Sequence, residues 1–111
     1  MDENVVTSRY LRTAGNPILA IKDGLISIEE ELKEKYKEFE VFSVGTTGSG
    51  RYLANIVVGS DIVKNEISSH AVATLREIPD VRTIFEIGGQ DSKIIIIRDG
   101  VVVDFAMNTV C

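Results

Sequence analysis

Residues 81–105 constrain the fold most, because they read as three short strands joined by turns, with no helix between them. The first strand is expected at Val81–Ile87, the second at Lys93–Arg98 and the third at Val101–Phe105. Asp99-Gly100 separates the last two and favours a type I′ turn, which needs positive φ at both central residues. The sequence therefore predicts an antiparallel three-stranded meander in the last third of the chain.

The preceding residues alternate helices with short strands. Three short strands are expected, at Glu40–Val44 and within Asn4–Thr13 and Asp61–Glu66. Three helices alternate with them. The first is opened by Asn16-Pro17 and reaches Tyr36, the second spans Tyr52–Val58, and the third is capped by Ser68 or Ser69 and runs to Ile78. Strands separated by helices favour parallel pairing with crossover helices. We expect an α/β fold with a parallel βαβ core between Glu40 and Pro79, followed by the meander.

Both long helices show an apolar face. The first has apolar residues at spacings of three and four, with Glu29–Lys33 and Glu31–Lys35 pairs on its polar side and Gly24 as a slightly weakening residue. The buried side of the last helix is expected to consist of Ala71, Val72, Leu75 and Ile78.

Composition excludes several classes of function. The chain has 111 residues and a net charge of -5, which argues against general binding of nucleic acid or anionic membranes. No apolar run approaches the roughly 20 residues of a membrane span, and the start of the chain does not resemble a secretory signal. A single cysteine cannot form an internal disulfide, so a reducing, cytoplasmic setting is expected.

The turn Gly88–Lys93 (GGQDSK) is the first candidate site. Glycines let backbone N–H groups approach a phosphate, and a carboxylate such as Asp91 is the kind of ligand that Mg²⁺ prefers. Gln90 is suited to orient a water molecule, and Lys93 to meet a phosphate. An ordinary polar turn with solvated side chains remains an alternative. A Walker loop is excluded, because GK[ST] is missing and a strand follows the turn.

The loop Gly45–Arg51 (GTTGSGR) is the second candidate site. It lies between an expected strand and an expected helix, where backbone amides and the helix dipole favour anions. Its pattern is not GxGxxG, which argues against a dinucleotide site, and a plain βα loop remains an alternative. From the sequence alone, Cys111 is read as a small buried hydrophobe and His70 as a structural histidine.

Five blocks of the sequence resemble one family, in the right order: YLRTAGNPILAIKDGL, SVGTTGSGR, KNEISSHAVA, IFEIGGQDSK and FAMNTVC. The family is the activators of 2-hydroxyacyl-CoA dehydratases with the ATPase subunits of benzoyl-CoA reductase, also called CoA-substrate-specific enzyme activases. It lies within the actin, sugar kinase and Hsp70 group. The resemblance implies an actin-like (ribonuclease H-like) lobe over residues 1–80. Residues 81–111 would then open a second lobe with its antiparallel strands, and they would contain the second phosphate loop, at the turn Gly88–Lys93, and the cluster cysteine.

The resemblance also implies site residues. The catalytic residues would be Asp91 and Gln90, and the metal ligands would be Asp91 for Mg²⁺ and Cys111 for an iron–sulfur cluster. The nucleotide-binding residues would be Gly88, Gly89, Gln90, Lys93, Gly45, Thr46, Gly48, Gly50 and Arg51.

The family further implies cofactors and partners. ATP/ADP and Mg²⁺ would lie between two lobes, and a homodimer would share one 4Fe–4S cluster. ATP hydrolysis would drive transfer of one low-potential electron to a 2-hydroxyacyl-CoA dehydratase or a related reductase. Reduced ferredoxin or flavodoxin would supply the electron.

Other parts of the family pattern have no counterpart in the chain. A DxGS-type phosphate loop would precede Tyr10, and a second cysteine would follow Cys111. We therefore expect an internal piece or truncated form of an activase, with weak nucleotide binding or none on its own. The alternatives are a non-catalytic α/β domain that binds a phosphate or a protein, and a fragment that associates through its exposed edge.

Overall fold

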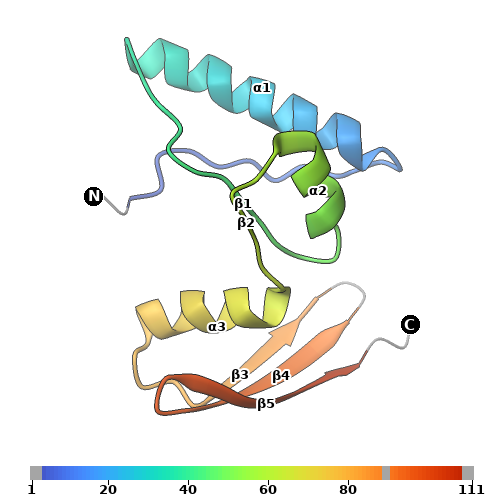
Figure 1. Cartoon of the computed structure of the whole chain (residues 1–111), viewed down its shortest axis with the longest axis vertical. Coiled ribbons are helices and arrows are strands. Elements are labelled where there is room, and N and C mark those ends of the chain that lie inside the picture. The colour runs from blue at the N-terminus through green and yellow to red at the C-terminus, as the bar shows by residue number, and fades with distance from the viewer. Residues whose placement is uncertain (1–3, 89–90, 109–111) are drawn as a thin grey trace. The chain divides into compact units, whose positions relative to one another are not determined.

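The computed structural model describes residues 4–88 and 91–108. Its elements in chain order are α1 (Pro17–Lys35), β1 (Gly45–Thr46), α2 (Arg51–Val58), β2 (Ile62–Val63), α3 (Glu66–Glu77), β3 (Thr83–Ile87), β4 (Ser92–Arg98) and β5 (Val101–Asn108) (Figure 1). No helix in the described part is long and apolar enough to cross a membrane.

The chain divides into two compact units. The N-terminal unit consists of Met1–Thr46 and Tyr52–Val63, and the C-terminal unit of Thr47–Arg51 and Lys64–Cys111. Helix α3 thus belongs to the same unit as the meander. The assignment of residues 1–80 and 81–111 to two lobes stays a prediction.

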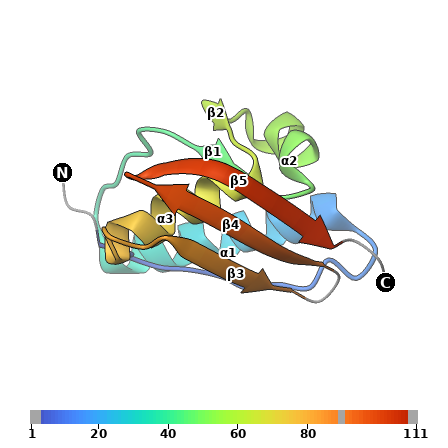
Figure 2. The same cartoon turned by 90° about the horizontal axis from the view of Figure 1, so that it is seen from below.

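The C-terminal unit is a three-stranded antiparallel sheet with α3 across one face (Figure 2). Its strand order is β3-β4-β5, which confirms the predicted meander. Asp99 and Gly100 have φ values of 53° and 76°, as a type I′ turn requires. A register shift between Ile96 and Ile97 shows that β4 and β5 pair with one irregularity.

The core of this unit lies between α3 and the sheet. Ile95 and Ile97 of β4 are 0% exposed, and they pack with Ile67 and Ala71 of α3. The predicted helix face was partly wrong. Ala71 is buried and Leu75 packs against the core, whereas the two other predicted residues, Val72 and Ile78, are 68% and 52% exposed. The buried line runs through Ile67, Ala71 and Leu75 at four-residue spacing, and the sequence reading omitted Ile67.

The expected cap of α3 was also wrong. Asn65 is the N-cap, and its Oδ1 accepts a hydrogen bond from the backbone N–H of Ser68 at 2.8 Å. Ser68 and Ser69 lie inside the first turn of the helix. Asparagine is among the best N-cap residues, and strand β2 ends at Val63, earlier than expected, which leaves Asn65 free to cap.

The N-terminal unit contains α1 and a minimal parallel pair. The Asn16 side chain accepts from the Leu19 N–H at 3.1 Å, which confirms the predicted cap. The predicted pairs are confirmed, with Lys33 2.6 Å from Glu29 and Lys35 3.4 Å from Glu31. A Cβ at buried Gly24 would lie 3.2 Å from Leu11 Cδ1, so this glycine is a packing point between the helix and the preceding segment.

Two expected strands are corrected. Residues 4–13 form no strand, because no ladder pairs them within the described part of the chain. Residues 40–44 form none either, and the strand begins at Gly45, which pairs in parallel with Ile62. Val44 is held instead by Asp61, whose Oδ2 accepts from the Val44 N–H at 2.7 Å. The β1–α2–β2 order still confirms a parallel crossover, although each strand has only two residues.

Glu31 of α1 binds Arg9 of the N-terminal segment, with 3.2 Å between Oε1 and Nη2, and this link between the segment and α1 is expected to depend on pH. Hydrogen bonds from Thr7 and then Arg9 lower the pKa of the Glu31 carboxyl from its usual 4.5. Because the pKa is depressed in the folded chain, the stabilisation is complete above the unfolded value and is lost as pH falls through the folded one. We expect the NMR chemical shifts of residues 7–11 to move toward their unfolded values as pH falls below about 4. Glu31→Gln should remove this dependence, and an unchanged profile would contradict the link.

Candidate functional site

The turn between β3 and β4 is closed at its base by the backbone. The N–H of Gly88 donates to the carbonyl oxygen of Asp91 at 2.8 Å. A Cβ at residue 88 would lie 3.4 Å from that oxygen and 3.7 Å from Asp91 Oδ1, which are ordinary contact distances. Gly89 and Gln90, which were predicted to bind nucleotide, lie outside the described residues, as does Cys111.

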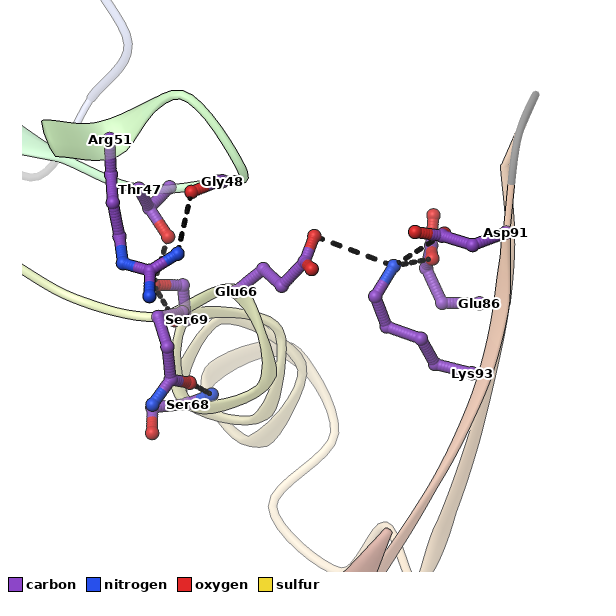
Figure 3. Close-up of polar contacts among 10 residues, drawn as sticks. Thr47, Gly48, Arg51, Glu66, Ser68, Ser69, Glu86, Asp91 and Lys93 are labelled. Carbon is purple, nitrogen blue, oxygen red and sulfur yellow. Dashed lines mark hydrogen bonds and ion pairs between the residues drawn. The ribbon is translucent and has the colours of Figure 1, made fainter. Parts of the chain in front are cut away.

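Lys93 lies beneath this turn, 5% exposed, and is surrounded by carboxylates (Figure 3). Its Nζ donates to Asp91 Oδ1 and to Glu86 Oε2, each at 2.8 Å. The Oε2 atom of Glu66, the first residue of α3, lies 3.5 Å from the same nitrogen. Hydrogen bonds between ionised groups are about twice as strong as neutral ones, so this cluster fixes the base of the turn.

The register of the hairpin explains the cluster. Glu86 pairs directly with Lys93 across β3 and β4, and directly opposed opposite charges stabilise a sheet. Lys93 also alternates with Ile95 and Ile97 on the side of β4 that faces α3. An inward-facing lysine must be paired, because a buried charge without a partner is strongly unfavourable. The sequence reading missed Glu66 and Glu86, although a charged residue at an inward strand position signals such a partner.

The electrostatics of the cluster favour a cation at the turn. The hydrogen bonds that the Lys93 ammonium donates to Asp91 and then to Glu86 raise its pKa above the usual range, although burial opposes this. The lysine therefore stays protonated, and three carboxylates surround one ammonium. The excess of negative charge would repel a bare phosphate, whereas a phosphate accompanied by Mg²⁺ would be tolerated.

The described residues can supply one carboxylate ligand to a magnesium ion, which would take its other ligands from water and phosphate oxygens. They contain no group of three or more histidine, cysteine or acidic side chains arranged around a metal position. Asp91 is the one predicted metal ligand among them, and its side chain is 29% exposed. Mg²⁺ commonly takes only one or two carboxylates, with waters and phosphate oxygens completing its shell. Asp91 is therefore suited to hold the ion directly or through water.

The second predicted loop is distributed over both units. Gly45 and Thr46 form β1 in the N-terminal unit, and Gly48, Gly50 and Arg51 belong to the C-terminal unit. Arg51 Nη1 donates to the carbonyl of Gly48 at 2.9 Å, and Gly48 has a positive φ of 89°. The loop is thus folded back on itself at the start of α2.

This loop is joined to α3 within the C-terminal unit. The Oγ atoms of Thr47 and Ser69 are 2.9 Å apart, and Ser69 Oγ donates to the Asn65 carbonyl at 2.9 Å. Because the single hydroxyl proton of Ser69 is used there, Thr47 must be the donor to Ser69. Beside it is a cavity of about 370 Å³. Its lining residues are Arg51, Asn65, Glu66, Ile67, Ser68, Val102, Phe105 and Met107.

Comparison with known proteins identifies the family to which the chain belongs. The model of the BadF/BadG/BcrA/BcrD ATPase family matches residues 1–111. The chain belongs to this family. Proteins with similar sequences include the (R)-2-hydroxyglutaryl-CoA dehydratase activating ATPase of Acidaminococcus fermentans, which is 38% identical over 88 residues, 77% of this chain and 32% of that protein.

Solved structures agree with the family assignment. The activator of 2-hydroxyisocaproyl-CoA dehydratase from Clostridium difficile, with bound ADPNP, matches with a TM-score of 0.64 and 33% identity over 79% of this chain and 33% of that one. Component A of the Acidaminococcus fermentans dehydratase matches with a TM-score of 0.62 and 28% identity, over 88% of this chain and 35% of that one. The chain has the actin-like α/β fold of these activators and spans about a third of their length.

Proposed function

We propose that the chain is part of an ATP-hydrolysing activator of a 2-hydroxyacyl-CoA dehydratase or a related CoA-thioester reductase. Its turn Gly88–Lys93 would be the second phosphate loop of that activator. The observation that carries the proposal is the Asp91 carboxylate, fixed by Lys93 at 2.8 Å beside the glycine turn. Family membership and the ADPNP-bound relative support the same function.

In this proposal the turn holds the nucleotide and its metal. The Gly88 position lets the backbone approach a phosphate, and Gly89 is expected to do the same. Asp91 would hold Mg²⁺, which neutralises charge on the phosphates, and Gln90 would orient the attacking water. Gly45, Thr46, Gly48, Gly50 and Arg51 are proposed to face the nucleotide from the other loop.

Electron transfer completes the proposal. Cys111 would give one thiolate to a 4Fe–4S cluster shared by two subunits. Such clusters are usually held by four thiolates, two from each subunit when two subunits share the cluster, so Cys111, the single cysteine of the 111 residues, would supply one of the two that each subunit gives. The electron would come from reduced ferredoxin or flavodoxin and pass to the dehydratase.

A chimaera tests the function. The matching segment of the Acidaminococcus fermentans activating ATPase is replaced by this chain, and the relative supplies the remaining two thirds of its own length. We expect ATP hydrolysis and activation of (R)-2-hydroxyglutaryl-CoA dehydratase to remain within about tenfold of the parent, a loss of about 1.4 kcal/mol in the barrier. Circular dichroism and thermal unfolding serve as the control for folding.

Two results would contradict the proposal. A folded chimaera that binds no ATP would remove the turn from the nucleotide site. A chimaera that binds ATP with normal affinity but never hydrolyses it would favour the alternative of a non-catalytic phosphate-binding domain.

A further inference from the structure

Lys93 differs from a typical phosphate-binding lysine because its N–H groups donate to carboxylates of the same chain. An ammonium has three N–H donors, and two of them are used by Asp91 and Glu86. The Glu66 carboxylate lies 3.5 Å from the same nitrogen. The side chain is 3% exposed, so contact with a phosphate would require it to leave a carboxylate and move to the surface.

The same contacts give Lys93 a different role. It is the common partner of a residue in the turn, a residue in β3 and the first residue of α3 (Figure 3). Glu66 is also a wall residue of the 370 Å³ cavity beside the Thr47–Arg51 loop. The cluster therefore connects the turn to α3 and to that cavity within one unit.

We propose that Lys93 is a positioning residue that orients the Asp91 carboxylate for the metal–nucleotide complex, and that Glu66 fixes Lys93 to α3. This inference rests on the proposed function. Lys93 acts through Asp91 and touches neither ATP nor the metal. A misplacement of about 1 Å in a catalytic group can cost about 100-fold in rate, so the orientation of Asp91 matters although Lys93 does no chemistry.

The kinetic test separates positioning from phosphate binding. In the chimaera, Lys93→Met is expected to lower kcat about 100-fold and to leave the KM for ATP within about twofold. Lys93→Arg should recover part of kcat, because a guanidinium can pair with two carboxylates. Glu66→Gln should lower kcat less than Lys93→Met. Glu77→Gln, at the exposed last residue of α3, is the matched control and should change nothing.

The structural test uses the 111-residue chain itself and needs no nucleotide. The Gly88 amide, which is bonded to Asp91, is expected to exchange at least tenfold faster in Lys93→Met and measurably faster in Glu66→Gln. The amide of Ile97, bonded to Arg82 at 2.7 Å, reports whether the sheet remains folded. If the Ile97 amide also loses protection in Lys93→Met, the sheet itself is disturbed. The exchange rate of the Gly88 amide in Glu66→Gln then decides whether the cluster orders the turn.

The outcomes are distinct. A raised KM for ATP with unchanged kcat would overturn the inference and make Lys93 a phosphate ligand. Unchanged Gly88 exchange in both variants, with the Ile97 amide protected, would also overturn it. If the unaltered chimaera fails to hydrolyse ATP, the proposed function fails, and the exchange comparison still decides whether Lys93 and Glu66 order the turn.

Discussion

Ile95→Ala is expected to lower the free energy of unfolding of the C-terminal unit by about 3 kcal/mol, within the 2–5 kcal/mol typical of such truncations. Ile95 is 0% exposed and packs between α3 and the sheet. The cost combines the lost burial with the cavity that remains, and the core has few other large buried side chains to fill it. Domains are typically stable by only 5–15 kcal/mol, so this change is large.

Urea unfolding followed by circular dichroism measures this effect. Ile87→Ala is the matched control, because Ile87 lies on the same sheet but is 82% exposed. Its expected change is within about 0.5 kcal/mol. Equal destabilisation by the two variants would contradict the placement of the core between α3 and the sheet.

Asp91→Asn is expected to lower ATP hydrolysis by the chimaera about 100- to 1000-fold, the range seen when one electrostatic contact to a transition state is removed. The asparagine oxygen can still accept the hydrogen bond from Lys93, so the turn keeps its partner while the negative charge is lost. Mg²⁺ binds carboxylate oxygens more strongly than neutral ones. The loss should therefore appear in the chemistry and in the magnesium requirement, with little change in the fold.

Steady-state phosphate release at several magnesium concentrations measures this prediction. Asp80→Asn, in the exposed turn after α3, removes an equal charge outside the proposed site and serves as the control. An unchanged rate in folded Asp91→Asn would exclude Asp91 from the metal site.

The sequence predicted those parts of the fold that local rules decide. Asn16 caps α1, and Asp99-Gly100 forms the type I′ turn, because both depend on residues near in sequence. The cap of α3 was misassigned to Ser68 or Ser69, because serine and asparagine compete as caps within five residues. Residues 4–13 have apolar side chains typical of a strand, yet a strand needs a partner that local sequence does not specify.

The candidate site was predicted in part. The glycine turn with Asp91 is visible as a motif, whereas the environment of Lys93 depends on the strand register and on the packing of α3. Glu86 was within reach of prediction, because the four-residue turn places it opposite Lys93. Glu66 was not, because only tertiary packing brings the start of α3 to the end of the hairpin.

The central claim is that Asp91 holds the metal of a metal–ATP complex at the β3–β4 turn. Anomalous X-ray diffraction from crystals of the chimaera with Mn²⁺ and ADPNP tests it most directly, because manganese gives a peak that no light atom produces. The account predicts one manganese peak in direct or single-water contact with the Asp91 carboxylate, with Lys93 still bonded to Asp91 and Glu86. A manganese–ADPNP complex bound at other carboxylates, with Asp91 out of reach of the ion, would contradict it.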